Sequence, residues 1–131
     1  MIIISRTFFN SKDSYDHYSS YNISIIKATE YIEDNLHNKL HISDIANYAN
    51  LSTSRLQHIF KEEIGISLIK YINKKRLVKA KELLRNGENA INIYQKCGFQ
   101  DYTSFFRAFR KEYDMTPKSY QLQYKEFMRK N

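Results

Sequence analysis

The chain has 131 residues, of which 42% are hydrophobic and 27% charged, and its formal net charge is +7. This length allows one compact unit or two small lobes, and the composition excludes a disordered or fibrous protein. The single cysteine, Cys97, excludes an intramolecular disulfide, and there is no CxxC or CxxH pattern for a metal site. The excess of lysine and arginine favours a polyanionic partner, either nucleic acid or an anionic membrane surface.

Helices are expected throughout, because the chain has only three glycines and one proline and its apolar residues recur at helical spacing rather than in alternation. The opening segment MIIISRTFF is interrupted by Arg6, is too short to cross a bilayer and lacks a cleavage-site pattern. We therefore expect a cytoplasmic protein with no membrane anchor.

Residues 1–21 show no sustained period, and they are expected to form an N-terminal arm or a frayed, disordered lead-in. A first helix is predicted over 22–36, starting at Asn22, which resembles a cap. Its apolar residues are Ile25, Ala28, Ile32 and Leu36.

A helix-turn-helix unit is predicted within HISDIANYANLSTSRLQHIFKEEIG. Ser43 can cap a short helix, Asn50 tolerates the left-handed conformation of a tight turn, and Ser52 can cap a second helix. Gly65 ends that second helix, and Ala46 leaves room for the two helices to cross closely. The residues expected to face inward are Ile45, Ala46, Ala49, Leu56, Ile59 and Phe60.

A long linker helix is predicted over 68–85, ended by Asn86 and Gly87. Its apolar stripe contains Ile69, Ile72, Leu77, Ala80, Leu83 and Leu84.

The plan of the first unit then repeats, with a short helix around 89–96, a turn at Gly98 and a second helix over 101–112. Thr116 and Pro117 are a cap and first-turn pair for a last helix. Phe105, Phe109 and Tyr113 are expected to face inward from the helix over 101–112, and the last helix carries Tyr120 and Tyr124. Cys97, beside the second turn, is interpreted as a small buried apolar residue.

The predicted fold class is all-α, with about seven helices arranged as two helix-turn-helix lobes joined by a long linker helix. The first lobe covers 22–66, the linker helix 67–86 and the second lobe 87–124, and residues 125–131 form a basic tail.

The second helix of each lobe, about 52–63 and 101–112, has an outward face of short polar and cationic side chains. Arginine can donate two hydrogen bonds to guanine, glutamine can pair with adenine, and threonine or an aromatic edge can contact the thymine methyl group. Gln57 and Arg107 are the leading candidates for such contacts. Phosphate contacts are expected from Lys61, Arg110 and Lys111, which flank the reading faces.

The predicted linker of 18 residues spans about 27 Å, whereas successive major-groove segments on one DNA face are about 34 Å apart. Both helices would therefore reach one face only if they tilt or the DNA bends.

Two segments resemble the AraC/XylS family of bacterial transcription regulators, in particular its short stand-alone members of the MarA, SoxS and Rob type. They are LSTSRLQHIFKEEIGISLIKYINKKRLVKAKELL and GFQDYTSFFRAFRKEYDMTPKSY, and the resemblance extends over about residues 22–124. It implies double-stranded DNA and RNA polymerase as partners, activation as the usual outcome, and binding as a monomer to asymmetric sites. It implies no cofactor and a nucleoid-associated location, and this length leaves no room for a small-molecule effector domain.

Residues at the family's base-facing positions are Ser54, Gln57, His58, Tyr102, Thr103, Phe106 and Arg107, and Ser52 and Thr53 join the expected phosphate contacts. Departures from the family pattern are Ser54 in place of a large aromatic, Phe106 in place of a small polar residue, Tyr94 in place of a small residue and Asp114 in place of a glycine.

Several alternatives stay open. The chain is interpreted either as a DNA reader or as a helical interaction module that docks an acidic partner, such as RNA polymerase, without reading bases. It is also compatible with being the DNA-binding piece of a longer effector-responsive regulator. Phe106 can instead belong to the core and His58 to the solvated surface. No converging carboxylates or phosphate-binding loop point to an enzyme.

Overall fold

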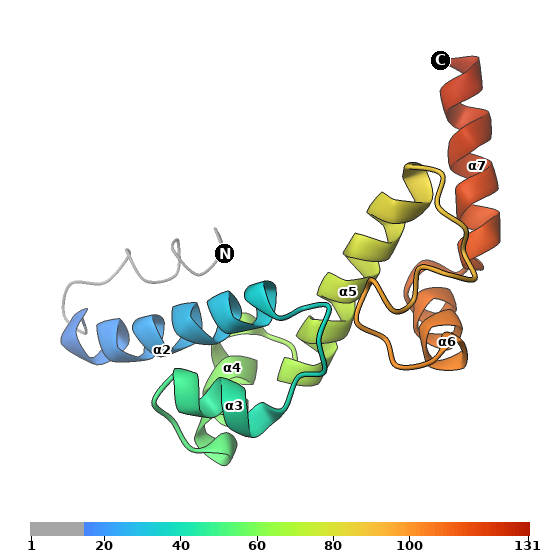
Figure 1. Cartoon of the computed structure of the whole chain (residues 1–131). Helices are drawn as coiled ribbons and strands as arrows, with labels where there is room; N and C mark the ends of the chain where they lie inside the picture. Colours follow the sequence, from blue (N-terminus) through green and yellow to red (C-terminus); the bar gives the residue numbers. More distant parts are fainter. Residues whose placement is uncertain (1–14) are drawn as a thin grey trace. The chain divides into compact units, whose positions relative to one another are not determined.

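The computed structural model describes residues 15–131, with side chains from residue 23 onward (Figure 1). The expected N-terminal arm lies, up to residue 14, outside the described residues. Residues 15–131 form an all-α structure with no strand. Its helices are α2 (Tyr15–Asp34), α3 (Ile42–Tyr48), α4 (Thr53–Ile64), α5 (Leu68–Arg85), α6 (Tyr102–Tyr113) and α7 (Pro117–Lys130).

The chain divides into two compact units. Among the described residues, the first contains 15–35 together with 40–71, and the second contains 36–39 together with 72–131. The helix α5 is continuous across the division, so its first turn belongs to the first unit and the rest to the second.

The first unit buries the apolar face of α2 against α3 and α4. Ile25, Ala28 and Ile32 recur on one face of α2 because residues three and four apart in a helix lie above one another, and all three are fully buried. The predicted inward residues of the first helix-turn-helix are buried as well. They are Ile45, Ala46, Ala49, Leu56, Ile59 and Phe60.

The turn between α3 and α4 and the two ends of α4 follow the sequence prediction at three positions. Asn50 has a φ of 60°, in the left-handed region. The Ser52 side chain accepts a hydrogen bond of 3.2 Å from the Arg55 N–H and so caps α4, and Gly65 ends α4 with a φ of 92°. The prediction for Ser43 is wrong. It lies within α3, whose N-cap is His41 without a side-chain hydrogen bond, because the helix begins at Ile42.

The helix α5 buries most of its predicted stripe, with Leu77, Ala80 and Leu84 at most 2% exposed. Ile69 is an exception, since half of its surface is exposed. At the other end, the Gly87 N–H donates to the Leu84 carbonyl at 3.0 Å with a φ of 89° at the glycine, which is the predicted stop.

The core of the second unit consists of side chains from α5, the 90–99 segment and α6. Phe105 and Phe109 are fully buried, with ring centroids 5.9 Å apart in an edge-on arrangement. Thr116 caps α7 by accepting a 3.0 Å hydrogen bond from the Ser119 N–H, and Pro117 occupies the first turn as predicted. Tyr120 then packs against Phe109.

The predicted short helix over 89–96 is wrong, because this segment is a series of turns. The Asn89 side-chain oxygen accepts from the Ile91 N–H at 3.0 Å, and the Asn89 carbonyl accepts from the Asn92 N–H at 3.0 Å. Such local bonds offer the backbone an alternative to the helical ladder. Two helices that cross closely need a small residue at their contact. The bulky Tyr94 stands at that position here, and it is half-buried against the core. Six helices are therefore present in residues 15–131 instead of about seven.

Two boundaries also differ from the sequence prediction. The helix α2 begins at Tyr15 rather than at Asn22. The helix α7 continues to Lys130, so most of the segment predicted as a basic tail is helical. Asp114 has a φ of 61° at the C-cap of α6. Aspartate tolerates this conformation better than most residues other than glycine, which accounts for its presence at a glycine position.

Candidate nucleic-acid interface

The exposed face of α4 carries every residue predicted to contact DNA from the first unit. Leu56, Ile59 and Phe60 anchor the opposite face in the core, so the polar side chains of the helix face solvent. The predicted contact residues Ser52, Thr53, Ser54, Gln57, His58 and Lys61 are all exposed, as are Arg55 and Glu62 on the same helix. Gln57 is thus free to meet a base edge.

Two acidic residues lie at the C-terminal end of α4. His58 Nε2 is 3.1 Å from Glu62 Oε2, one turn along the helix, and both side chains are about two-thirds exposed. Burial raises the pKa of Glu63, and the neighbouring charge of Glu62 raises it further. Because a phosphate backbone repels carboxylates, the N-terminal half of α4 is the part that suits DNA.

Asp101 determines where α6 begins. Its carboxylate accepts hydrogen bonds from the Ser104 N–H at 2.7 Å and the Ser104 hydroxyl at 3.1 Å. These bonds, with a smaller contribution from the charge of Arg107, hold the pKa of Asp101 below its usual range. The carboxylate therefore satisfies the free N–H groups at the first turn of α6.

The outward face of α6 is cationic. Arg107, Arg110 and Lys111 are exposed, and none of them forms an ion pair with a residue in the described part of the chain. Thr103 is exposed beside them, one turn N-terminal to Arg107. This side of the helix therefore offers cationic hydrogen-bond donors to a partner.

Tyr102 and Phe106 occupy a different environment from their polar neighbours. Both are half-buried, and their ring centroids are 5.9 Å apart. Tyr102 also contacts Phe105 and Tyr94, so it packs against the core of the second unit. Each aromatic side chain thus supports the fold with part of its surface and leaves part of it accessible.

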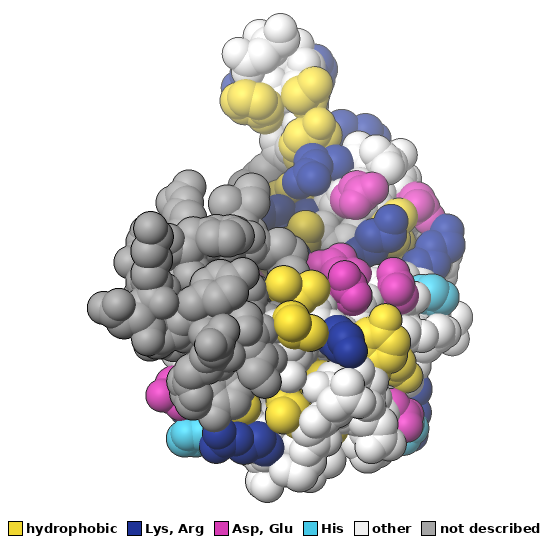
Figure 2. All heavy atoms as spheres, turned by 90° about the vertical axis from the view of Figure 1, so that its left-hand side faces the viewer, with side chains coloured by type: hydrophobic (Ala, Val, Ile, Leu, Met, Phe, Trp, Pro, Cys, Tyr) yellow, Lys and Arg dark blue, Asp and Glu magenta, His cyan; other side chains and the backbone are white. Residues whose placement is uncertain are grey.

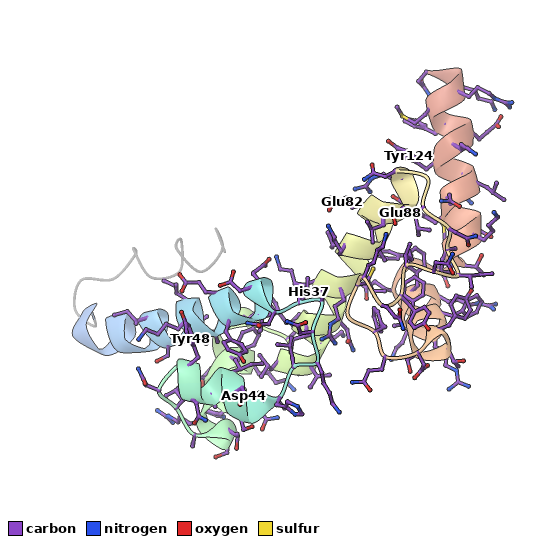
Figure 3. All side chains as sticks on the ribbon, viewed as in Figure 1. His37, Asp44, Tyr48, Glu82, Glu88 and Tyr124 are labelled. Carbon is purple, nitrogen blue, oxygen red and sulfur yellow. The ribbon has the colours of Figure 1, made fainter. Side chains whose placement is uncertain are left out.

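A hollow that was not predicted from the sequence lies beside the N-terminus of α6. It has a volume of about 360 Å³ and is lined by His37, Lys39, Gln95, Gly98, Phe99 and Gln100. His37 belongs to the segment between α2 and α3, as Figure 3 shows. No carboxylate lines the hollow. No local pattern marks His37 and Lys39, because only the fold brings them next to the turn before α6.

Residues 45–123 match the helix-turn-helix domain family. A transcriptional regulator from Chromobacterium violaceum, described as an AraC-type DNA-binding domain-containing protein, has a fold similar to that of this chain. Its TM-score is 0.71 at 28% identity, over 77% of this chain and 91% of that one. The chain belongs to the AraC family of DNA-binding transcription regulators. The predicted resemblance and the predicted all-α, two-helix-turn-helix fold class are confirmed, and this is a family of DNA-binding regulators rather than enzymes.

Two further proteins are similar to this AraC-family chain. The probable transcriptional regulator LumQ of Photobacterium leiognathi is 33% identical over 100 residues, which are 76% of this chain and 40% of LumQ. The chain thus spans two fifths of that relative's length, and a smaller share of other curated relatives. The DNA-binding domain of AdpA, solved in complex with a target DNA, shares the fold with a TM-score of 0.77 at 17% identity, over 82% of this chain and 98% of that one.

Two other kinds of site receive no support within the described residues. No helix between Tyr15 and Lys130 is both long and apolar enough to cross a membrane. No group of three or more histidine, cysteine, aspartate or glutamate side chains in the same range is placed to hold a metal ion.

Proposed function

We propose that this AraC-family chain reads double-stranded DNA by inserting α4 and α6 into successive major-groove segments, and that it activates transcription. The observation that carries the proposal is the matching design of the two helices. Each begins at a side-chain cap, Ser52 or Asp101, buries an apolar stripe and exposes polar and cationic side chains from its first turns. The N-terminal part of a recognition helix is the part that enters the groove in helix-turn-helix proteins.

Base contacts are assigned by side-chain chemistry. Gln57 pairs with adenine and Arg107 with guanine, since each can make two hydrogen bonds to its base. Ser54, His58 and Thr103 border these contacts, and the accessible edges of Tyr102 and Phe106 meet thymine methyl groups.

Phosphate contacts surround the two reading faces. Those predicted from the sequence are Ser52, Thr53, Lys61, Arg110 and Lys111. We add the hollow of His37 and Lys39, which lies beside the start of α6 and has cationic or neutral polar groups to meet a phosphate on the edge of the same groove.

A single chain carries two reading helices, so we propose that it binds asymmetric sites as a monomer. Activation then requires a contact with RNA polymerase from a surface that the DNA leaves uncovered.

The test is a selection of bound sites from random duplexes, followed by binding measurements on the selected site and its single-base variants. Arg107→Ala is expected to weaken binding to the selected site by about 1–3 kcal/mol and to relax the preference at one base pair.

Lys111→Ala is expected to weaken binding to all sequences alike. If selected and scrambled sites bind equally at physiological salt, the chain is an interaction module and the proposal is wrong.

A further inference from the structure

A second hollow lies in the second unit between the C-terminal end of α5 and α7. Its volume is about 260 Å³, and it is lined by Leu84, Arg85, Gly87, Asn89, Lys118, Gln121, Tyr124 and Lys125. Tyr124 lies on α7 where that helix passes the end of α5 (Figure 3). None of these residues belongs to α4 or α6, so the proposed DNA contacts leave this hollow unused.

The walls of the hollow are held in place by hydrogen bonds. Gln121 Nε2 donates to the carbonyl oxygens of Leu84 at 3.0 Å and Glu88 at 2.7 Å, which ties α7 to the end of α5. Arg85 Nη1 donates to the Tyr120 hydroxyl at 2.8 Å. Gln121 and Arg85 are therefore already ordered, and a ligand that enters the hollow loses less free energy to ordering these two side chains.

The hollow has an uncompensated positive charge. Arg85, Lys118 and Lys125 line it, and none forms an ion pair with a residue of the described chain.

The carboxylates nearest in sequence are paired with other cations. Glu82 lies 3.8 Å from Lys79, Glu88 contacts Lys96, and Glu126 lies 2.6 Å from Arg129. The hollow therefore attracts an anionic group that the unit itself does not supply.

An exposed apolar stripe continues from the hollow along α7. Phe127 and Met128 follow Tyr124 by three and four residues, so they lie on the same face of the helix. They are 61% and 54% exposed. Apolar and cationic side chains gather near the C-terminal end of α7, at the top of Figure 2. A partner of this surface must therefore offer both negative charge and apolar groups.

We propose that this surface, defined by Arg85, Lys118, Tyr124, Lys125, Phe127 and Met128, docks an acidic amphipathic segment of a partner protein. Carboxylates of the segment occupy the hollow, and its apolar side chains cover Phe127 and Met128. The DNA backbone fits less well, because phosphates and sugars offer no large apolar group to these two residues. A second copy of the chain also fits less well, because it would bring an equally cationic surface into contact. The inference rests on the proposed DNA contacts only for the folding readout and the matched control of its test.

The test measures the binding of a fluorescent peptide of alternating glutamate and leucine residues to the whole chain, by anisotropy. The double variant Lys118→Glu with Lys125→Glu is expected to weaken peptide binding by about tenfold or more, because charge reversal replaces attraction with repulsion. Phe127→Ser is expected to weaken it by a smaller factor. Both variants are expected to keep the affinity of the chain for its selected DNA site, which also shows that they are folded.

The matched control is Lys61→Glu with Lys111→Glu, which changes the net charge by the same amount. It is expected to abolish specific DNA binding and to leave peptide binding unchanged. The proposal is overturned if the two double variants weaken peptide binding equally, since net charge alone would then explain it. It is also overturned if the Lys118/Lys125 variant loses DNA affinity instead, or if inorganic phosphate at matched ionic strength displaces the peptide, because the hollow would then be a site for DNA or for a small anion.

Discussion

Arg76 and Gly98 show how single residues hold the second unit together. Arg76 Nε donates to the Leu36 carbonyl at 3.1 Å, and its Nη2 donates to the Asn38 carbonyl at 2.9 Å. Partial burial of this guanidinium lowers the pKa of Arg76. A Cβ on Gly98 would come within 2.2 Å of the Leu36 oxygen and 2.6 Å of Arg76 Nε. Glycine is required there by the close approach of the backbone.

Gly98→Ala is expected to destabilise the chain more than Gly87→Ala. Both glycines have similar left-handed φ values, 94° and 89°, so both variants carry a conformational cost of about 1–2 kcal/mol. Only at Gly98 does the new methyl group also collide with neighbours, whereas nothing lies within 4 Å at Gly87. We expect about 1–3 kcal/mol of additional destabilisation at Gly98, measured by urea denaturation. Equal losses for the two variants would show that the close approach is relieved by small movements.

Cys97 is expected to be unreactive in the folded protein. It is 1% exposed, and burial raises the pKa of its thiol to about 12. Because the thiolate is the reactive form, labelling by a disulfide reagent at pH 8 should be slow in the native chain and fast in guanidinium chloride. Rapid labelling of the native chain would instead support a redox role.

At the scale of secondary structure, the helices α4 and α6, which we propose to read DNA, depend on their caps. Ser52, Asp101 and Thr116 each accept a hydrogen bond from the backbone N–H three residues later. A cap determines the residue at which a helix begins, and so it determines which side chains occupy the first turn. In α4 and α6 this first turn leads into the proposed reading face.

Asp101→Ala is expected to lower the melting temperature, whereas Asp101→Asn should preserve most of the cap. The pKa of Asp101 is depressed in the folded chain, chiefly by its hydrogen bonds from Ser104. The stability that its charge contributes is therefore present above the unfolded-state pKa and is lost as pH falls through the lower folded-state pKa. Melting curves at neutral and acidic pH should show the difference between wild type and Asp101→Ala becoming smaller in acid. A difference that is independent of pH would show that the charge of the cap contributes nothing.

Local sequence rules predicted elements with caps and strong periods better than those without them. Ser52 marks the start of α4, Thr116 and Pro117 mark the start of α7, and Gly87 marks the end of α5. Each of these residues acts on the backbone within a few positions of itself. The segment 89–96 did not form the predicted helix, because its short length gives little propagation energy and Asn89 closes a competing turn.

At the scale of the whole molecule, the length of α5 leads to a prediction about the DNA. A helix of 18 residues spans about 27 Å, which is less than the roughly 34 Å between successive major-groove segments. If both reading helices dock on one face of the duplex, bending supplies part of the difference, at an elastic cost of about 1–6 kcal/mol. A mobility assay with circularly permuted fragments should then show migration that depends on the position of the site. Migration that is independent of position would require tilted helices on straight DNA.

The sequence by itself determined the fold class and most of the buried and exposed helix faces, including the exposed faces of α4 and α6 that we propose to read DNA, because helical period, capping and turn conformation act over a few residues. It also carried the family resemblance, which rests on patterns such as Gly98 followed by Phe99 and Thr116 followed by Pro117. Three features depend on the tertiary structure and could not be predicted from the sequence. They are the hollow beside α6, the hollow beside α7 and the contact of Arg76 with the segment after α2. Each brings together residues far apart in the chain, as with Leu36 and Arg76, which are 40 positions apart. Helix propensity, capping and turn preferences do not predict these long-range contacts, because the contacts depend on how a packed core brings separate segments together.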